Sequence, residues 1–384
     1  MTGKLIKHGA AVISVLCILA LTLGSCGISD ISKLVGDILI TAPKYSYSMF
    51  RSAVSDCVMR QSAECTITCS YDGGFKELIN IVNIDADRLF AEDEYVSYYV
   101  RMFRPSYTHN ANNVQIKCKL AYYENTVARD NIIDADKIDL QVVYAAAKIL
   151  QTGEQTVAFH SANGFDDDEI QSLLNTVSIN SGTAYTFSDY ECMYYPQDSR
   201  KILQLNFMSN IPKEKRVQLN KQLYEKVSEI AAKIAAENEG ENKKRMCLAI
   251  HNYICENTRY DYDIVPESVT NDEAMIARSA YGALFDGKTI CSGYSRAFFL
   301  LYNEIIGDGQ CEIIAGTYED GDDGGGHAWN VVHDNGERYY IDCTFDDYDD
   351  GGYGFDYFYE PTDSDNFKHH IIEKNYILEY DIDS

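Results

Sequence analysis

A segment near the end of the chain, HAWNVVHDNGERYYIDCTF, constrains the fold most. Asp334-Asn335-Gly336 joins two strand-like runs, which predicts a tight β-hairpin. With a two-residue loop, His327 and Asp342 share one face: they are directly opposite if the loop is Asp334-Asn335 and diagonal if it is Asn335-Gly336. A three-residue loop would put Asp342 on the other face. We therefore expect an antiparallel sheet that brings a histidine and an aspartate together.

A cysteine upstream completes a candidate catalytic triad. Cys291 lies at the start of the apolar run in KTICSGYSRAFFLLYNEIIG, between a polar turn and a helix predicted from Ser292 toward Ile306. The amide-rich end of that helix and an ion pair with His327 would both favour the thiolate. Asp342 would hold the imidazole tautomer, and the Cys291 amide would contribute to an oxyanion hole. This order of residues predicts a nucleophilic cysteine with its base and an orienting acid.

Two aromatic residues are candidates for substrate binding. Trp329 lies two residues beyond His327 on the same predicted face, so it either walls the acyl site or packs into the core. Tyr294 follows Cys291 by three residues. His251 and Cys255 have the i, i+4 spacing of a metal pair, but no second pair accompanies them, so packing is the favoured interpretation. We expect no metal and no cofactor.

The charge balance limits the partners of the chain. The formal net charge is -26, which leaves no basic surface for phosphates and excludes nucleic acid as a partner. Acidic runs at 319–326 and 345–356 flank the candidate site and favour substrates that bear amines. We expect these runs to be solvated loops and not calcium sites, because they lack the ligand spacing of an EF-hand.

The first residues have the pattern of an export signal. Lys4 and Lys7 precede an apolar run from Ala10 to Leu23, which is short for a spanning helix. The junction Leu23-Gly24-Ser25-Cys26 resembles the lipobox of bacterial lipoproteins, so we expect a signal peptide over 1–25 and a lipid on Cys26 that anchors the protein outside the cell membrane. The alternative is an uncleaved anchor with a chance cysteine.

The chain has 12 cysteines, which is many for an exported protein. Cys17 would leave with the signal, Cys26 would carry lipid and Cys291 would stay free. The remaining nine cannot all pair, so disulfides are compatible with the sequence but not required.

We divide the rest of the chain into a linker over 26–45, a mixed α/β region over 46–210 and a catalytic domain over 211–384. Strands are predicted at AECTITCSY, EYVSYYVRMF, NNVQIKCKLAYY and KILQLNF, and helices at DADKIDLQVVYAAAKIL and DDDEIQSLLNTV. The third and fourth strands are each followed by an amphipathic helix, which suggests two repeats. Helices at Pro212–Asn238 and over KKRMCLAIHNYICENTRYD would lead into the catalytic domain.

These motifs together resemble the transglutaminase-like superfamily, in its bacterial exported branch. The resemblance covers about Met246 to His370, through AIHNYICENTRYDYD, YGALFDGKTICSGYSRAFFLL, HAWNVV and YYIDCTFDD. It implies an α+β fold with a papain-like core, a helix at the nucleophile and an antiparallel sheet, and the triad Cys291, His327 and Asp342. Ser292 stands where the family usually has glutamine, Thr289 where it has glycine and Cys343 where it has proline.

The expected function is a thiol enzyme that acts on an amide or peptide through a thioester. Hydrolysis is slightly favoured over transfer to an amine, and protein or cell-wall peptide is the expected substrate class. The alternative is a surface binding or scaffold protein with an inert core, which a disulfide from Cys291 to Cys311 or Cys343 would favour. A metal hydrolase built on His251 and His327 lacks suitably spaced ligands. The sequence does not predict an oligomeric state.

Overall fold

The computed structural model describes residues 38–110, 113–265, 271–307, 309–320, 323–348 and 350–373. The chain divides into two compact units, 1–126 and 127–384. The predicted signal peptide and Cys26 lie outside the described residues. Within the described ranges, no helix combines the length and the apolar character that crossing a membrane requires.

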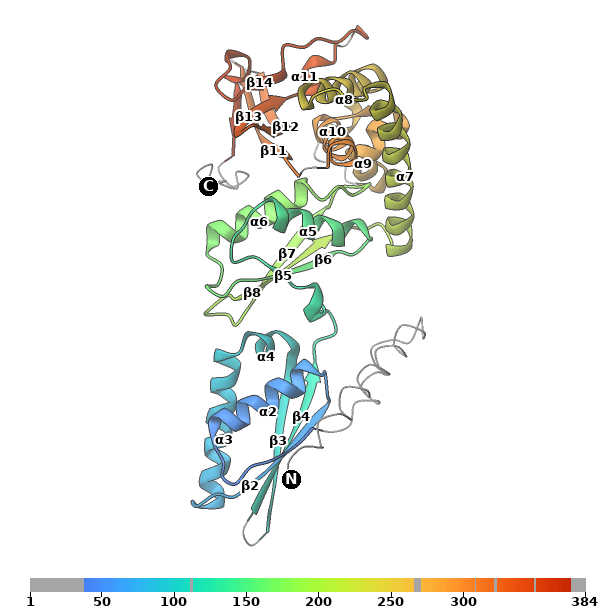
Figure 1. Ribbon diagram of the computed structural model, residues 1–384. Helices are drawn as coiled ribbons and strands as arrows, with labels where there is room; N and C mark the ends of the chain where they lie inside the picture. Colours follow the sequence, from blue (N-terminus) through green and yellow to red (C-terminus); the bar gives the residue numbers. More distant parts are fainter. Residues whose placement is uncertain are drawn as a thin grey trace, which may run out of the picture. The chain divides into compact units, whose positions relative to one another are not determined.

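The first unit is a four-stranded sheet with helices (Figure 1). Its strand order is β1-β2-β4-β3, with β1 parallel to β2 and the other pairs antiparallel. The elements are β1 (Ile38–Thr41), α2 (Tyr47–Met59), β2 (Glu64–Cys69), α3 (Phe75–Glu92), α4 (Glu94–Tyr99), β3 (Val100–Asn110) and β4 (Asn113–Tyr122).

The second unit begins with the same topology. Its first sheet has the order β5-β6-β8-β7, again with one parallel pair, β5 with β6, and two antiparallel pairs. The elements are β5 (Ile133–Asp134), α5 (Leu140–Gln151), β6 (Thr156–His160), α6 (Asp167–Ile179), β7 (Asp189–Tyr195) and β8 (Ile202–Met208). The chain therefore contains two βαβαββ modules, and in both of them the fourth strand lies between the second and the third.

The two modules only partly match the repeat predicted from the sequence. The strands NNVQIKCKLAYY and KILQLNF are β4 and β8, which occupy equivalent places. The helices paired with them are not equivalent, because α5 is the first helix of the second module whereas α7 (Lys213–Glu237) follows that module.

One predicted strand is wrong in its first half. The run EYVSYYVRMF begins as the short helix α4, and only its last residues belong to β3. Asp93 caps this helix, with its carboxylate 3.0 Å from the Val96 amide. The cap outweighs the strand preference of valine and tyrosine.

The predicted boundary at 210 cuts through the second unit. Asn180, at the end of α6, exchanges two hydrogen bonds with the backbone of Ile313, at 2.8 and 3.3 Å. Arg296 donates to the carbonyl oxygen of Ile179 at 3.2 Å. All three side chains are buried. The second module is therefore packed against the predicted catalytic domain, so 127–373 is one folded body.

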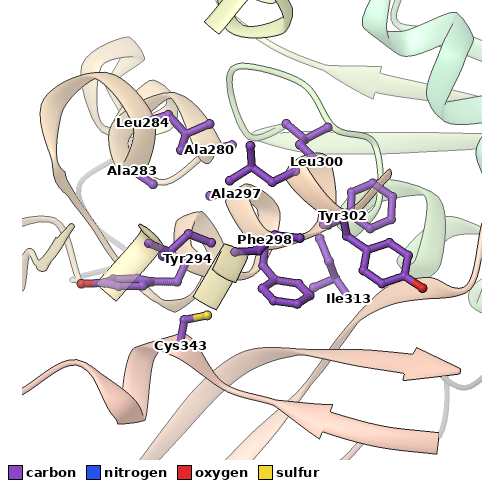
Figure 2. Close-up of a cluster of buried hydrophobic side chains, with 14 of the residues drawn as sticks. Ala280, Ala283, Leu284, Tyr294, Ala297, Phe298, Leu300, Tyr302, Ile313 and Cys343 are labelled. Carbon is purple, nitrogen blue, oxygen red and sulfur yellow. The ribbon is translucent and has the colours of Figure 1, made fainter. Parts of the chain in front are cut away.

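The helices α7 and α8 (Lys243–Asn257) form where they were predicted and bury one face each. They pack with α10 (Cys291–Ile305) in a core that also takes side chains from the following sheet and from the second module. Figure 2 shows this core, with Phe298 and Tyr302 of α10 near Ile313 of the sheet, and with Cys343 near Tyr294. The core fixes the start of α10, where Cys291 lies.

The final sheet carries the hairpin that the sequence predicted. Its antiparallel strands have the order β14-β13-β12-β11-β15. In the hairpin, Asp334 pairs with Glu337, so the loop is Asn335-Gly336, and the positive φ of both residues (55° and 82°) is what a type I′ turn requires. His327 and Asp342 are therefore diagonal neighbours on one face. The strands are β11 (Cys311–Asp320), β12 (Asp323–Asp334), β13 (Glu337–Ile341), β14 (Phe358–Pro361) and β15 (His370–Ile372).

Candidate active site

Asp342 is held by hydrogen bonds to both of its carboxylate oxygens. It follows β13 and caps the short helix α11 (Cys343–Asp346), with Oδ1 accepting from the amides of Thr344 at 2.9 Å and Phe345 at 3.3 Å. Oδ2 accepts from Nε2 of His327 at 2.6 Å and from Nε2 of His370 at 3.1 Å. Burial favours the neutral acid, but the two histidines outweigh it and hold the pKa of Asp342 below its usual range. The aspartate is a fixed anion.

Two stacked aromatic rings and a hydrogen bond at Nε2 hold the His327 ring in place. It lies on β12 and stacks on Phe345, with ring centroids 4.6 Å apart, and on Trp329, with centroids 5.8 Å apart. Burial opposes protonation, yet the charge of Asp342, its hydrogen bond and a hydrogen bond with Cys291 raise the pKa of His327 to about 10. Because Nε2 bonds Asp342, Nδ1 is the ring nitrogen that remains for the thiol.

Cys291 is the first residue of α10, as the sequence predicted. Its side chain is 9% exposed and belongs to the main core. Cys291 thus lies at the amino-terminal end of α10, where the helix begins after Ile290. The structure thus brings Cys291, His327 and Asp342 together from a helix, a strand and a strand end.

Thr289 and Ser292, which depart from the family pattern, both use their hydroxyls inside the protein. Thr289 Oγ1 donates to the Ala277 carbonyl at 2.6 Å, and Ser292 Oγ donates to the Arg278 carbonyl at 2.8 Å. These two hydrogen bonds hold the segment around Cys291 against the residues at 277–278.

We expect Gly293→Ala to destabilise the protein by about 1–3 kcal/mol, because a Cβ there would meet Thr289, with Cγ2 only 2.6 Å away. Urea unfolding followed by circular dichroism measures the change. Thr289→Gly in the same chain removes the obstructing atoms and should restore part of the loss. A single variant as stable as the wild type would contradict this packing.

A cavity of about 580 Å³ opens beside the triad. Its wall includes His327 but not Cys291, and it is mostly aromatic: the other lining residues are Tyr260, Tyr262, Tyr318, Thr344, Phe345, Asp347, Tyr348 and Tyr357. Burial, and then the nearby Cys291, raise the pKa of Tyr260. An aromatic wall of this kind suits an extended or apolar acyl group.

Neither candidate substrate-binding residue lines this cavity. Trp329 is 0% exposed and packs with Ile314, Val331, Tyr340 and Phe367. Tyr294 is also buried, and its hydroxyl donates to Asp347. Trp329 thus contacts the site through the rings of His327 and His370, and Tyr294 through Asp347. The structure gives no support to direct substrate contact by either residue.

We expected the whole acidic run at 345–356 to be a solvated loop, but part of it is buried. Asp346 is fully buried against His251, and Asp347 is buried between Tyr294 and Arg259, whose Nη1 lies 3.1 Å from it. Asp346 is thus engaged within the fold, and Asp347, which lines the cavity, is paired with Arg259 and Tyr294.

His370 is the site residue that the sequence did not indicate. It lies on β15, which pairs with β11 at the edge of the sheet, and its ring packs 4.5 Å from Phe367 and 5.0 Å from Trp329 between centroids. No local pattern marks a histidine 28 residues beyond the aspartate that it binds. Its pairing depends on a long-range strand contact.

All ten cysteines in the described part of the chain are free thiols. Cys291, Cys311 and Cys343 are among them, so the disulfide that would have favoured an inert scaffold is not formed there.

Comparison with known proteins gives similarity to solved structures alone. No protein-family model and no curated protein sequence matches the chain. A transglutaminase (TGase) structure is 16% identical over 49% of this chain and 50% of its own, with a TM-score of 0.27. A candidate cysteine protease from Cytophaga hutchinsonii is 15% identical over 41% of this chain and 61% of its own, with a TM-score of 0.25.

A candidate protease from Parabacteroides distasonis is 9% identical over 73% of this chain and 40% of its own, with a TM-score of 0.23. This chain thus spans between 40% and 61% of the length of these structures. These low identities and TM-scores carry no information about the function of this chain, so the evidence for the site is the geometry of its own residues.

Proposed function

We propose that this protein is an exported, lipid-anchored thiol enzyme with a papain-like core, which cleaves or transfers amide acyl groups through Cys291, His327 and Asp342. The observation that carries the proposal is the position of His327, held by Asp342 at 2.6 Å, with Cys291 of the first turn of α10 near enough to contribute to the raised pKa of the imidazole. In a catalytic triad the acid orients the imidazole through one ring nitrogen and leaves the other nitrogen for the nucleophile.

The chemistry follows from these three groups. The Cys291 thiolate attacks the amide carbon, and the developing oxyanion accepts from the Cys291 amide. The His327 imidazolium gives its proton to the leaving amine as the C–N bond breaks, which leaves a thioester. Neutral His327 then takes a proton from water, whose oxygen attacks the thioester and releases the acid and the Cys291 thiol. Asp342 stabilises the imidazolium that is present before the amine leaves and that forms again when water is deprotonated.

Hydrolysis is the favoured outcome, and an amine in place of water would make the protein a transferase. The aromatic cavity suits a peptide, and the net charge of -26 favours one that bears amines. The apolar run ending at Leu23, followed by Cys26, supports an extracytoplasmic location with a cell-wall peptide or a secreted protein as substrate.

Alkylation of the thiol at low pH tests this function. An ordinary thiol is mostly protonated at about pH 6, so it reacts slowly. We expect Cys291 in the reduced wild type to react with iodoacetamide at least about tenfold faster at that pH than Cys192, which is more exposed. His327→Ala should remove this advantage, because the imidazolium that pairs with the thiolate is gone.

Peptide mapping gives the rate for each cysteine, and Cys192 on β7 serves as the internal control in both proteins. If Cys291 follows the same pH profile as Cys192 in the wild type and in the variant, the triad is not active. The scaffold interpretation would then hold.

A further inference from the structure

A second group of metal-binding side chains lies apart from the triad. His251 and Cys255 are one turn apart on α8, while Cys343 and Asp346 are the first and last residues of α11. His251, Cys255 and Asp346 are 0% exposed, and Cys343 is 2% exposed. The sequence showed only the first pair, because the second lies almost 90 residues further along the chain.

The donor atoms of His251, Cys255 and Cys343 are close enough together to be ligands of one tetrahedral ion, and the Asp346 carboxylate is hydrogen-bonded beside them. Zinc holds nitrogen at about 2.0–2.1 Å and sulfur at about 2.3 Å, which puts neighbouring N and S ligands about 3.6 Å apart and N and O ligands about 3.3 Å apart. His251 Nε2 lies 3.7 Å from Cys255 Sγ and 3.0 Å from Asp346 Oδ2. The donor atoms of His251, Cys255 and Cys343 all lie within 4.8 Å of one another.

We propose that His251, Cys255 and Cys343, whose donor atoms already lie together, bind a zinc ion that ties α8 to α11, and that the Asp346 carboxylate moves from its hydrogen bond with His251 to become the fourth ligand. Two thiolates, one imidazole and one carboxylate are a donor set that suits Zn²⁺ better than the oxygen-loving Ca²⁺ or Mg²⁺. Four protein ligands leave no open position, so the role of the ion is structural. Binding would displace the two thiol protons and the proton that His251 Nε2 shares with Asp346. Cys255 now donates its thiol proton to the Cys343 carbonyl at 3.5 Å.

The surroundings of the group exclude water and fix the imidazole. The His251 ring lies between 5.1 and 6.3 Å from the rings of Phe358, Phe355 and Tyr353. Its Nδ1 contacts the side-chain oxygen of Asn252 at 3.4 Å, which leaves Nε2 for the ion. Arg259 donates to the Cys255 carbonyl at 2.7 Å, and its positive charge would partly offset the excess negative charge of three anionic ligands.

The triad side of the sheet offers a contrasting arrangement. His327, Asp342 and His370 also place three donor atoms within 4.8 Å, but Nε2 of His327 is only 2.6 Å from Asp342 Oδ2. That separation is a hydrogen bond and is well below the roughly 3.3 Å between ligands of a tetrahedral zinc. A hydrogen bond of 3.0 Å also joins His251 and Asp346, so the thiols of Cys255 and Cys343 are what distinguish the second group as a zinc site.

The zinc site would position the catalytic aspartate indirectly. Asp342 caps α11 and directly precedes Cys343, so an ion that holds Cys343 and Asp346 to α8 fixes the helix that Asp342 begins. Asp342 touches the reacting histidine, whereas the four ligands act only through it.

Cobalt binding tests the proposal on the full-length reduced protein, after any bound metal has been removed with a chelator. Co²⁺ in a tetrahedral thiolate site gives strong charge-transfer absorption, and we expect saturation at about one ion per chain. Zinc should displace the cobalt and raise the melting temperature. Cys255→Ala and Cys343→Ala should each abolish the cobalt spectrum.

Two variants serve as matched controls. Cys247→Ala removes another fully buried cysteine of α8, and His370→Ala removes a histidine of the other group; both should retain the spectrum. If the cysteine variants do not fold, wild-type protein suffices: in mild denaturant, zinc should protect Cys255 and Cys343 from alkylation but not Cys247.

Three outcomes would overturn the proposal. One is wild-type protein without the cobalt spectrum or zinc protection. Another is a spectrum that survives both cysteine variants or is lost in His370→Ala. The third is a Cys255–Cys343 disulfide, found by mass spectrometry in protein isolated without reductant. None of these measurements uses enzymatic activity, so they are independent of the proposed function.

Discussion

Asp342→Asn is expected to lower acyl transfer by roughly 10³–10⁴-fold, because in a triad the charge of the acid sets the tautomer and stabilises the imidazolium. Asparagine keeps the shape but replaces one oxygen with a donor. Oδ1 faces two amides and Oδ2 faces two histidine nitrogens, so the new NH₂ group opposes donors in either orientation. The rate of Cys291 alkylation at about pH 6 should fall together with the acyl-transfer rate.

Asp342→Ala should also destabilise the fold, by about 3–5 kcal/mol, since it leaves buried donors and a buried imidazolium without their partner. Urea unfolding and the alkylation rate together separate the two effects. Asp363→Asn, an exposed carboxylate in the turn after β14, is the matched control and should change neither quantity. If Asp342→Asn weakens the fold but leaves Cys291 fully reactive, the aspartate is only structural.

Trp329→Ala is expected to cost about 3–5 kcal/mol of unfolding free energy, because it removes the largest fully buried side chain of the final sheet. The cavity would lie between Tyr340 and Phe367, and His327 would lose one of its two stacking partners. Since this is the chain's single tryptophan, circular dichroism must follow the urea unfolding.

Trp329→Phe keeps an aromatic ring against His327 and should cost much less. The same variant distinguishes a packing role of Trp329 from a role in the wall of the substrate site. If Trp329 only packs, the phenylalanine variant should keep the wild-type rate of Cys291 alkylation at about pH 6. A phenylalanine variant that is stable yet processes substrate poorly would restore Trp329 as part of the substrate wall.

The part of the site that could be predicted is the part fixed by local chemistry. Asn335-Gly336 permits the positive φ of a tight turn, and the turn determines the register that brings His327 and Asp342 to one face. An apolar run preceded by a polar turn placed Cys291 at a helix start. Each inference needed only neighbouring residues.

The other parts of the site depend on contacts between distant segments. His370 reaches Asp342 only because β15 adds to the edge of the sheet, and Asp346 meets His251 across 95 residues. We interpreted His251 and Cys255 as packing residues because the sequence alone does not show that Cys343 and Asp346 lie beside them. The short helix α4 was missed for a different reason: its tyrosines and valine also suit a strand, and one capping aspartate decides the outcome.

The bonds from Asn180 and Arg296 determine where the catalytic part can be cut from the chain. A fragment that begins at Pro212 would expose core side chains and leave the Ile313 backbone groups without partners, at about 1–3 kcal/mol for each buried group. Such a fragment would be prone to aggregate. A fragment that begins at Val127 keeps the second module. It is therefore the shorter fragment that we expect to fold with the site intact, whether for crystallisation or for fusion to another protein.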